Sequence, residues 1–259
     1  MGRIILLDYS VFMFAAIFAC SRNKDNKIPP TYTSMAMMIS CLKELNATLD
    51  DTIIIAIDSR SWRKDVDPQY KANRKEKREE SDIDWEHWFK EYGKLRENIA
   101  QNTPFHVVQV EKMECDDLIA VATRYYSDRE CIIVSTDSDF EQLCCQPNVK
   151  CFSSKSKKFK EVKNPYKLLA KKIEQERTDN LLSPVLTEAD YNKRKMLVDL
   201  TSLPQWVEDT CKSAIDKIEK SCYNKTFDWD RLWFKKSLQP RLKALFYPVI
   251  EEKEQMELL

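Results

Sequence analysis

The chain has 259 residues, and its 42 Lys and Arg are balanced by 42 Asp and Glu, so the formal net charge is +0. This length is enough for one large α/β domain with a sizeable core. Only Gly2 and Gly93 are glycines, which excludes the glycine-rich phosphate loops of the Walker and dinucleotide-binding types. The nine cysteines lack the paired spacing of a zinc site, which indicates reduced thiols. No apolar run reaches the roughly 20 residues that cross a bilayer, so we expect a soluble protein with no membrane partner.

Short β-branched and apolar runs alternate with longer amphipathic runs over the first part of the chain, as in parallel strands joined by crossover helices. The predicted strands are Ile4–Leu7, Thr52–Ile57, Phe105–Val110, Cys131–Ser135 and Val149–Phe152. The predicted helices between them are Val11–Ala19, Thr33–Leu49, Asp84–Gln101, Asp116–Tyr126 and Asp139–Cys145. This pattern predicts an α/β fold with a central, mostly parallel, twisted sheet flanked by helices.

The strand pattern ends near residue 155, and lysine-rich and then helical segments follow. The helices predicted there are Pro165–Arg177, Glu188–Leu200, Trp206–Lys220 and Asp230–Phe246, with prolines near their boundaries. We therefore expect residues 1–152 to form the α/β core. Residues 153–259 would then form a lysine-rich segment and a helical C-terminal part packed on that core.

Acidic residues gather where the predicted strands end, which is the edge where open parallel sheets bind ligands. Three strands are followed directly by aspartates, and a fourth by three acids in the first turn of the next helix. The seven acids are Asp8, Asp58, Glu114, Asp116, Asp117, Asp137 and Asp139. One such carboxylate is usually a helix N-cap. Seven at one edge repel each other unless cations neutralise them, and oxygen ligands select Mg²⁺ or Mn²⁺. The sequence therefore predicts a metal centre suited to phosphodiester hydrolysis.

Two basic stretches supply the complementary charge, each with eight Lys or Arg. They are residues 60–78 and 155–172. A helix starting near Pro68 would place Tyr70, Lys71 and Arg74 on one face, where the cations could hold a phosphate and the ring could stack on a base. A solvated basic loop is the alternative, which the direct connection to an acidic strand end disfavours.

Together these motifs resemble the flap-endonuclease and 5′→3′ exonuclease family. The matching runs are Asp8, Asp58 with Arg63, residues 70–74, residues 114–117 and residues 135–143, in the order in which the family has them. A shorter run, residues 186–200, resembles the C-terminal part of the ribonuclease H enzymes of T-even phages.

The resemblance implies roles for individual residues. Glu114, Asp116, Asp8 and Asp58 would hold or surround a first metal, with Asp117, Asp137 and Asp139 near it or toward a second. Lys71 and Arg74 would act on the scissile phosphate with those first four acids, and residues 71–103 would form a helical gateway for a 5′ single strand. The expected nucleic-acid-binding residues are Arg63, Tyr70, Lys71, Arg74, Lys75, Arg78, Lys155, Lys157, Lys158 and Lys160.

One departure from the family concerns its Gly-Asp-x-x-Asp-x-x-x-Gly segment, which completes a second metal site and opens a potassium-dependent grip on duplex DNA. No glycine follows Phe140 in this chain. We therefore expect one firmly bound metal and leave the second metal and K⁺ open. The lysines from Lys155 to Lys172 would take over by plain phosphate contact.

The expected activity is that of a Mg²⁺-dependent 5′→3′ exonuclease or flap endonuclease, with Mn²⁺ able to substitute. Its substrate would be DNA with a 5′ flap or 5′ end, or an RNA·DNA hybrid, in primer or flap removal during phage replication. Two alternatives stay open: a catalytically weak relative that binds DNA as a structural module, and a PIN-type single-strand ribonuclease. We also expect a monomer, a single-stranded-DNA-binding protein as a partner, and a location in the cytoplasm, that of the host cell if a phage encodes the chain.

Overall fold

The computed structural model describes residues 2–22, 27–174, 185, 187–221, 226–233 and 237–248. Within them, five parallel strands form a sheet in the order β3-β2-β1-β4-β5. The strands are β1 (Ile4–Asp8), β2 (Thr52–Ile57), β3 (His106–Gln109), β4 (Cys131–Val134) and β5 (Val149–Phe152). The five predicted strands and the α/β fold class are confirmed.

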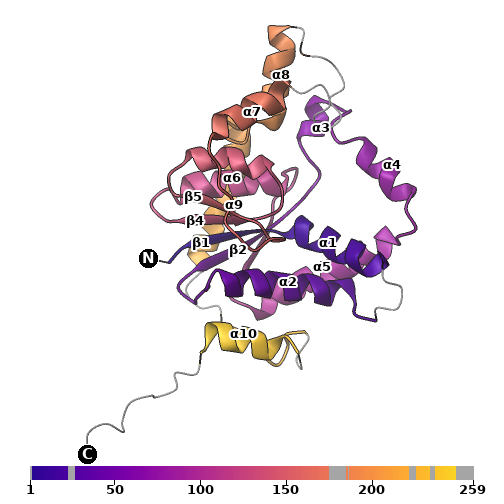
Figure 1. Cartoon of the computed structure of the whole chain (residues 1–259), viewed down its shortest axis with the longest axis vertical. Helices are drawn as coiled ribbons and strands as arrows, with labels where there is room; N and C mark the ends of the chain where they lie inside the picture. Colours follow the sequence, from indigo (N-terminus) through magenta and orange to yellow (C-terminus); the bar gives the residue numbers. More distant parts are fainter. Residues whose placement is uncertain are drawn as a thin grey trace, which may run out of the picture.

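Strand β1 lies at the centre of the sheet and is covered on both faces (Figure 1). Its side chains alternate between two cores: Ile5 and Leu7 pack in one, Ile4 and Leu6 in the other, and all four are fully buried. The first core is built with α1 (Tyr9–Arg22), α2 (Pro30–Glu44), α5 (Trp85–Asn102) and α10 (Gln239–Phe246), and the second with α6 (Cys115–Tyr125) and α9 (Gln205–Ser221). Burial on both faces explains why the strand is an unbroken apolar run.

The remaining helices lie at the carboxyl-end side of the sheet or beside it (Figure 1). They are α3 (Arg63–Val66), α4 (Asn73–Glu79), the 3₁₀ helix η1 (Asp139–Cys145), α7 (Pro165–Glu174) and α8 (Glu188–Val198). Helix α4 stands off the body of the molecule and buries none of its residues. Among the described residues, no helix is both long and apolar enough to cross a membrane. The division of the chain at residue 152 stays a prediction.

Several predicted helix boundaries were wrong, each for a local reason. The helix expected from Pro68 does not form, because Lys71 has a φ of 52°, and α4 begins only at Asn73. The helix expected at Thr33–Leu49 ends at Glu44, since Asn46 takes a φ of 47°. Of the helix expected at Asp230–Phe246, only α10 is helical in the described part. The final residues of the helix expected at Pro165–Arg177, after Glu174, lie outside the described residues.

Candidate active site

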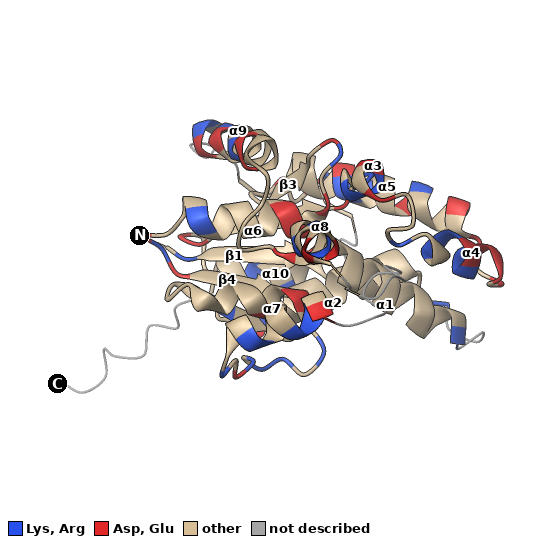
Figure 2. Ribbon diagram, turned by 90° about the horizontal axis from the view of Figure 1, so that it is seen from above, with Lys and Arg blue, Asp and Glu red and all other residues tan. Residues whose placement is uncertain are grey.

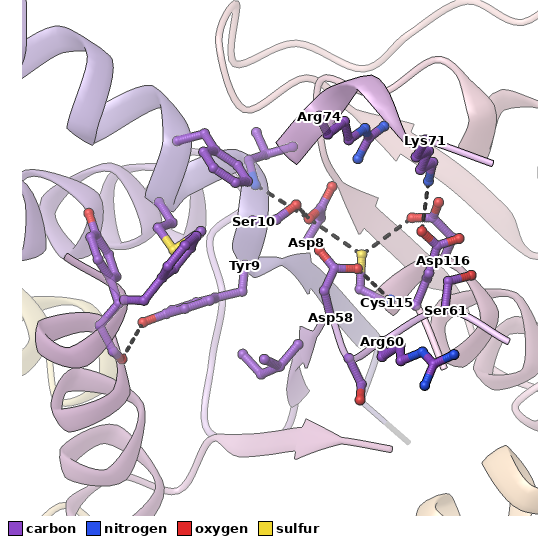
Figure 3. Close-up of a pocket in the computed structure, with 18 of the residues that line it drawn as sticks. Asp8, Tyr9, Ser10, Asp58, Arg60, Ser61, Lys71, Arg74, Cys115 and Asp116 are labelled. Carbon is purple, nitrogen blue, oxygen red and sulfur yellow. Dashed lines mark hydrogen bonds and ion pairs between the residues drawn. The ribbon is translucent and has the colours of Figure 1, made fainter. Parts of the chain in front are cut away.

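A cavity of about 360 Å³ opens at the carboxyl ends of the strands. Five acidic residues line it: Asp8 from β1, Asp58 after β2, Asp137 after β4, and Glu114 and Asp116 at the start of α6. Figure 3 shows Asp8, Asp58 and Asp116 converging on one space, with Lys71 and Arg74 facing them. The sheet order therefore brings together five of the seven predicted acids.

Hydrogen bonds fix the orientation of Asp8 and Asp58. Ser10 and Ser135 each donate a hydroxyl hydrogen bond of 2.8 Å to the Asp8 carboxylate, one to each oxygen. The backbone N–H of Cys115 donates to Asp58 Oδ1 at 2.9 Å. Each carboxylate keeps acceptor capacity for a further ligand, because a carboxylate offers about four lone-pair sites.

Burial, and to a smaller extent the crowding of like charges, raises the pKa of two aspartates at this edge. Burial raises the pKa of Asp8, and the nearby negative charge of Asp58 raises it further. Burial also raises the pKa of Asp116 well above its usual value; the positive charge of Lys71 opposes this rise, while Glu114, Asp58 and Asp137 add to it. Such a group of acids is stabilised by a divalent cation, and all the acidic donors are hard oxygens that suit Mg²⁺ or Mn²⁺.

In the described part of the chain, no three His, Cys, Asp or Glu side chains form a ready-made chelating group. The carboxylates that line the cavity are hard oxygen donors, and Mg²⁺ in proteins is usually held by one or two carboxylates and keeps several of its waters. The residues placed to hold a cation in the cavity, directly or through its waters, are Asp8, Asp58, Asp116 and Asp137, with Glu114 at the rim nearest Lys71.

Arg63 and Asp117 lie in the interior and not at the cavity. Arg63 is 1% exposed and donates two hydrogen bonds to Asp117, at 2.7 and 3.0 Å, and one to Glu114 at 3.0 Å. Its Nε donates to the carbonyl oxygen of Leu197 at 2.7 Å. The expectations that Arg63 contacts nucleic acid and that Asp117 binds metal therefore need correction, because the two side chains are buried and form an ion pair with each other. The pair holds the first turn of α6 in place.

Tyr70 is also buried, at 3% exposure, so its ring is not available to stack on a base. Its hydroxyl donates to Glu114 Oε2 at 3.0 Å, and Lys71 Nζ lies 2.8 Å from Glu114 Oε1. Burial acts to raise the pKa of Glu114, but the charges of Lys71 and Arg63 outweigh it and lower that pKa to about 2. Glu114 is thus an ionised anchor that sets Lys71 at the edge of the cavity.

The far wall of the cavity is basic. Arg74, Lys75 and Arg78 reach it from α4, and Figure 2 shows Lys and Arg along this helix. Arg74 and Lys75 are exposed and Arg78 is half-buried. The predicted basic residues of this region therefore face the acids across the cavity, except for Arg63.

The second basic stretch begins beside β5, where Phe159 forms a β-bridge with Phe152, and it does not line the cavity. Lys155 and Lys158 are exposed, whereas Lys157 bonds to Ser40. Lys160 Nζ bonds to Glu141 at 2.9 Å and to the carbonyl oxygen of Asp137 at 3.0 Å. Asp139, expected near a metal, is ion-paired with Lys172 of α7 and is not one of the residues that line the cavity.

Three site residues were not predicted. Cys115 places its sulfur 3.3 Å from Asp116 Oδ1 and 3.6 Å from Asp8 Oδ1. Ser10 and Ser135 hold Asp8, as described above. Their closeness in sequence to predicted acids was the available signal, since Ser10 is two residues from Asp8 and Cys115 adjoins Asp116.

Comparison with known proteins places the chain in a family. The model of the 5′-3′ exonuclease N-terminal, resolvase-like domain matches residues 3–174. The chain belongs to this 5′-3′ exonuclease family. A ribonuclease H of Enterobacteria phage T4 is 34% identical over 147 residues, which are 54% of this chain. The match covers 48% of that relative, so it spans about half the relative's length.

Solved structures give the same fold. A T5 5′-exonuclease with divalent metal ions (zinc) bound has a TM-score of 0.61 and 15% identity, covering 83% of this chain and 99% of that one. A bacteriophage T5 flap endonuclease, in a pseudo-enzyme-product complex with DNA and metal ions, has a TM-score of 0.58 and 16% identity. That match covers 86% of this chain and 100% of the other. These structures share the fold over 83% and 86% of this chain.

Replacing Arg63 by Ala should destabilise the protein by about 3–5 kcal/mol, because it leaves Asp117 and Glu114 charged and buried without their partner. The matched control is Arg60→Ala, three residues earlier, where a side chain that is 69% exposed pairs with Asp65 and the cost should be below about 1 kcal/mol. Urea unfolding of both variants measures the difference. Equal and small losses would show that the buried pair is not an anchor of the site.

Glu114 should make the stability of the metal-free protein depend on pH. Its pKa is lowered in the folded state, so its stabilisation is present above the unfolded value and is lost as the pH falls from about 4.5 toward 2. Near neutral pH, the free energy of unfolding of the wild type should exceed that of Glu114→Gln by about 3 kcal/mol. This difference should disappear as the pH falls through that acid range. Thermal unfolding in the presence of a chelator measures this difference as a function of pH, and the Glu111→Gln variant, at an exposed position, is the control. A gap that does not change with pH contradicts the pairing.

Proposed function

We propose that this chain is a metal-dependent 5′ nuclease that hydrolyses phosphodiester bonds at the 5′ end or 5′ flap of DNA, or in an RNA·DNA hybrid. The observation that carries the proposal is the cavity itself, with Asp8, Asp58 and Asp116 on one side and Lys71 and Arg74 on the other. Membership of the 5′-3′ exonuclease family supports the same reaction class. So do the names of its relatives, a ribonuclease H and a flap endonuclease.

The chemistry follows from the charges of the two walls. Mg²⁺, with Mn²⁺ able to replace it, would supply a bound water of lowered pKa and a positive charge beside the phosphate. Asp8, Asp58 and Asp116 would hold that cation, and hydrogen bonds from Ser10 and Ser135 fix the orientation of the Asp8 carboxylate. Lys71 is held at the cavity edge by Glu114, where its ammonium can contact a non-bridging phosphate oxygen. Arg74 faces the same space and adds a planar donor for a second oxygen.

Helix α4 suits the passage of a single strand. It links α3 to the segment before α5 and stands off the body (Figure 1). Its residues Arg74, Lys75 and Arg78 line the cavity together with the acids at the strand ends. Its cavity-lining side chains are basic, which favours a nucleic-acid backbone over a neutral substrate. We therefore propose that residues 71–103 form a gateway through which the 5′ single strand of the nucleic acid passes.

The test is cleavage of a 5′-labelled flap duplex with Mg²⁺ or Mn²⁺. Asp116→Asn should lower the cleavage rate by about 100-fold or more, because it removes an acid that orients the cation. Asp128→Asn, an exposed aspartate at the opposite end of β4, is the matched control and should cut at the wild-type rate. Flap binding without cutting by the wild type would indicate a DNA-binding relative instead. Preference for single-stranded RNA would indicate a PIN-type ribonuclease.

A second prediction separates the cavity-facing side of α4 from its outer side. Arg74→Ala should weaken binding of flap DNA and reduce its salt dependence by roughly one phosphate contact. Lys77→Ala removes an equal charge from the same helix at an exposed position outside the cavity lining, so its effect should be smaller. Binding titrations across a salt series compare the two variants. Equal effects would mean that α4 acts only through its net charge.

A further inference from the structure

Two cysteines outside the candidate active site, Cys144 and Cys151, lie in contact with each other. Cys144 lies in the last turn of η1, and Cys151 lies in β5, the edge strand next to β4 (Figure 1). Their Sγ atoms are 3.5 Å apart, and both thiols are free. Neither residue is among those that line the cavity. The proposed nuclease reaction therefore makes no use of this pair.

The elements that carry the two thiols are packed against each other. Cys151 is 3% exposed, and its backbone pairs with Ile133 of β4 in the parallel sheet. Its sulfur also donates to the carbonyl oxygen of Phe140, in the first turn of η1, at 3.5 Å. Phe140 and Leu143 are buried in the same core as Cys151. The fold therefore fixes the two sulfurs beside each other.

The two thiols differ in exposure and in acidity. Cys144 is half-buried, whereas Cys151 is buried. The contact with the Cys151 thiol lowers the pKa of Cys144, although burial opposes this change. The same contact, together with burial, raises the pKa of Cys151. Because the thiolate is the nucleophile in cysteine chemistry, Cys144 is the thiol suited to react first with a small oxidant, and Cys151 is placed to react with the product.

We propose that Cys144 and Cys151 form an oxidation site, at which a peroxide converts the two thiols into a disulfide that joins η1 to β5. The Cys144 thiolate attacks one oxygen of hydrogen peroxide, so that an S–O bond forms and the O–O bond breaks. The hydroxide that leaves takes up the thiol proton and becomes water.

The second step closes the disulfide. The Cys151 sulfur attacks the sulfenic acid sulfur of Cys144, so that the S–S bond forms and the S–O bond breaks. The hydroxyl group leaves with the proton of Cys151 as a second water. The two thiols together lose one electron pair, which reduces one peroxide to two waters.

Formation of this disulfide acts on an element that begins close to the active site. The sulfurs must approach from 3.5 Å to about 2.05 Å. Because Cys151 is held in the sheet, the approach draws the end of η1 toward β5. Helix η1 begins at Asp139, two residues after Asp137 of the cavity. The disulfide therefore restrains the segment that follows one of the cavity acids.

The test treats the reduced, folded full chain with hydrogen peroxide, blocks the remaining thiols and digests the protein with trypsin. Trypsin cleaves after Lys150, so residues 130–150 and 151–155 separate into two peptides unless a disulfide joins them. Mass spectrometry should find them joined in the wild type and separate after dithiothreitol. Protein oxidised in urea should give less of this pair, because only the fold holds Cys144 beside Cys151. An equal yield in urea contradicts a site built by the fold.

Three variants assign the roles of the individual thiols. Cys151→Ser should stop at the sulfenic acid on Cys144, which dimedone traps. Cys144→Ser should leave Cys151 as a free thiol that is alkylated only after unfolding. Cys145→Ser is the matched control, because Cys145 is the adjacent residue and is also half-buried, but burial raises its pKa. This variant should form the disulfide as the wild type does.

Two further results would overturn the proposal. One is a wild type in which peroxide leaves residues 130–150 and 151–155 unlinked, whether or not the variants fold. The other is a linkage that Cys145→Ser abolishes and Cys144→Ser retains. Neither result depends on cleavage of flap DNA, so the oxidation site and the proposed nuclease activity can fail separately.

Discussion

Repulsion between carboxylates at one edge of the sheet is the constraint on which the rest of this structure depends. Three strand ends and one helix start deliver acids to the same place, and an uncompensated charge there would cost several kcal/mol per buried ion. Two of the acids are neutralised by basic side chains of the protein: Arg63 forms an ion pair with Asp117, and Lys172 forms one with Asp139. Only the centre of the cluster keeps an excess of negative charge. That remaining excess supports the proposal that the cavity binds a divalent cation.

The topology explains why the cluster forms where it does. In the order β3-β2-β1-β4-β5 the direction of the crossovers reverses between β1 and β4. Ligands of open α/β sheets bind at this kind of switch point, beyond the carboxyl ends of the strands. Asp8 ends β1, and Ser135, the residue after β4, bonds to it at 2.8 Å. The fold thus supplies the cavity, and the chemistry comes from which residues follow each strand.

Sequence patterns predicted the strands and the cavity-lining acids because both depend on local signals. An apolar, β-branched run forms a buried strand in almost any context, and a residue directly after it lies at the sheet edge. The burial of Arg63 and Tyr70 could not be predicted from such local signals. Arg63 is buried because it meets Leu197, 134 positions away, and Tyr70 because it packs beside Ile173. Because of these distant contacts, Arg63 and Tyr70 form hydrogen bonds to Glu114 and are not exposed to contact nucleic acid.

Locating the bound cation is the most direct test of the proposed metal centre. Crystals of the wild-type protein soaked in Mn²⁺ would show it by anomalous scattering. We predict a peak within the cavity among the carboxylates of Asp8, Asp58 and Asp116, with Lys71 still paired to Glu114. A cavity without a peak, at Mn²⁺ concentrations that support cleavage, would contradict the claim that these carboxylates form the metal centre.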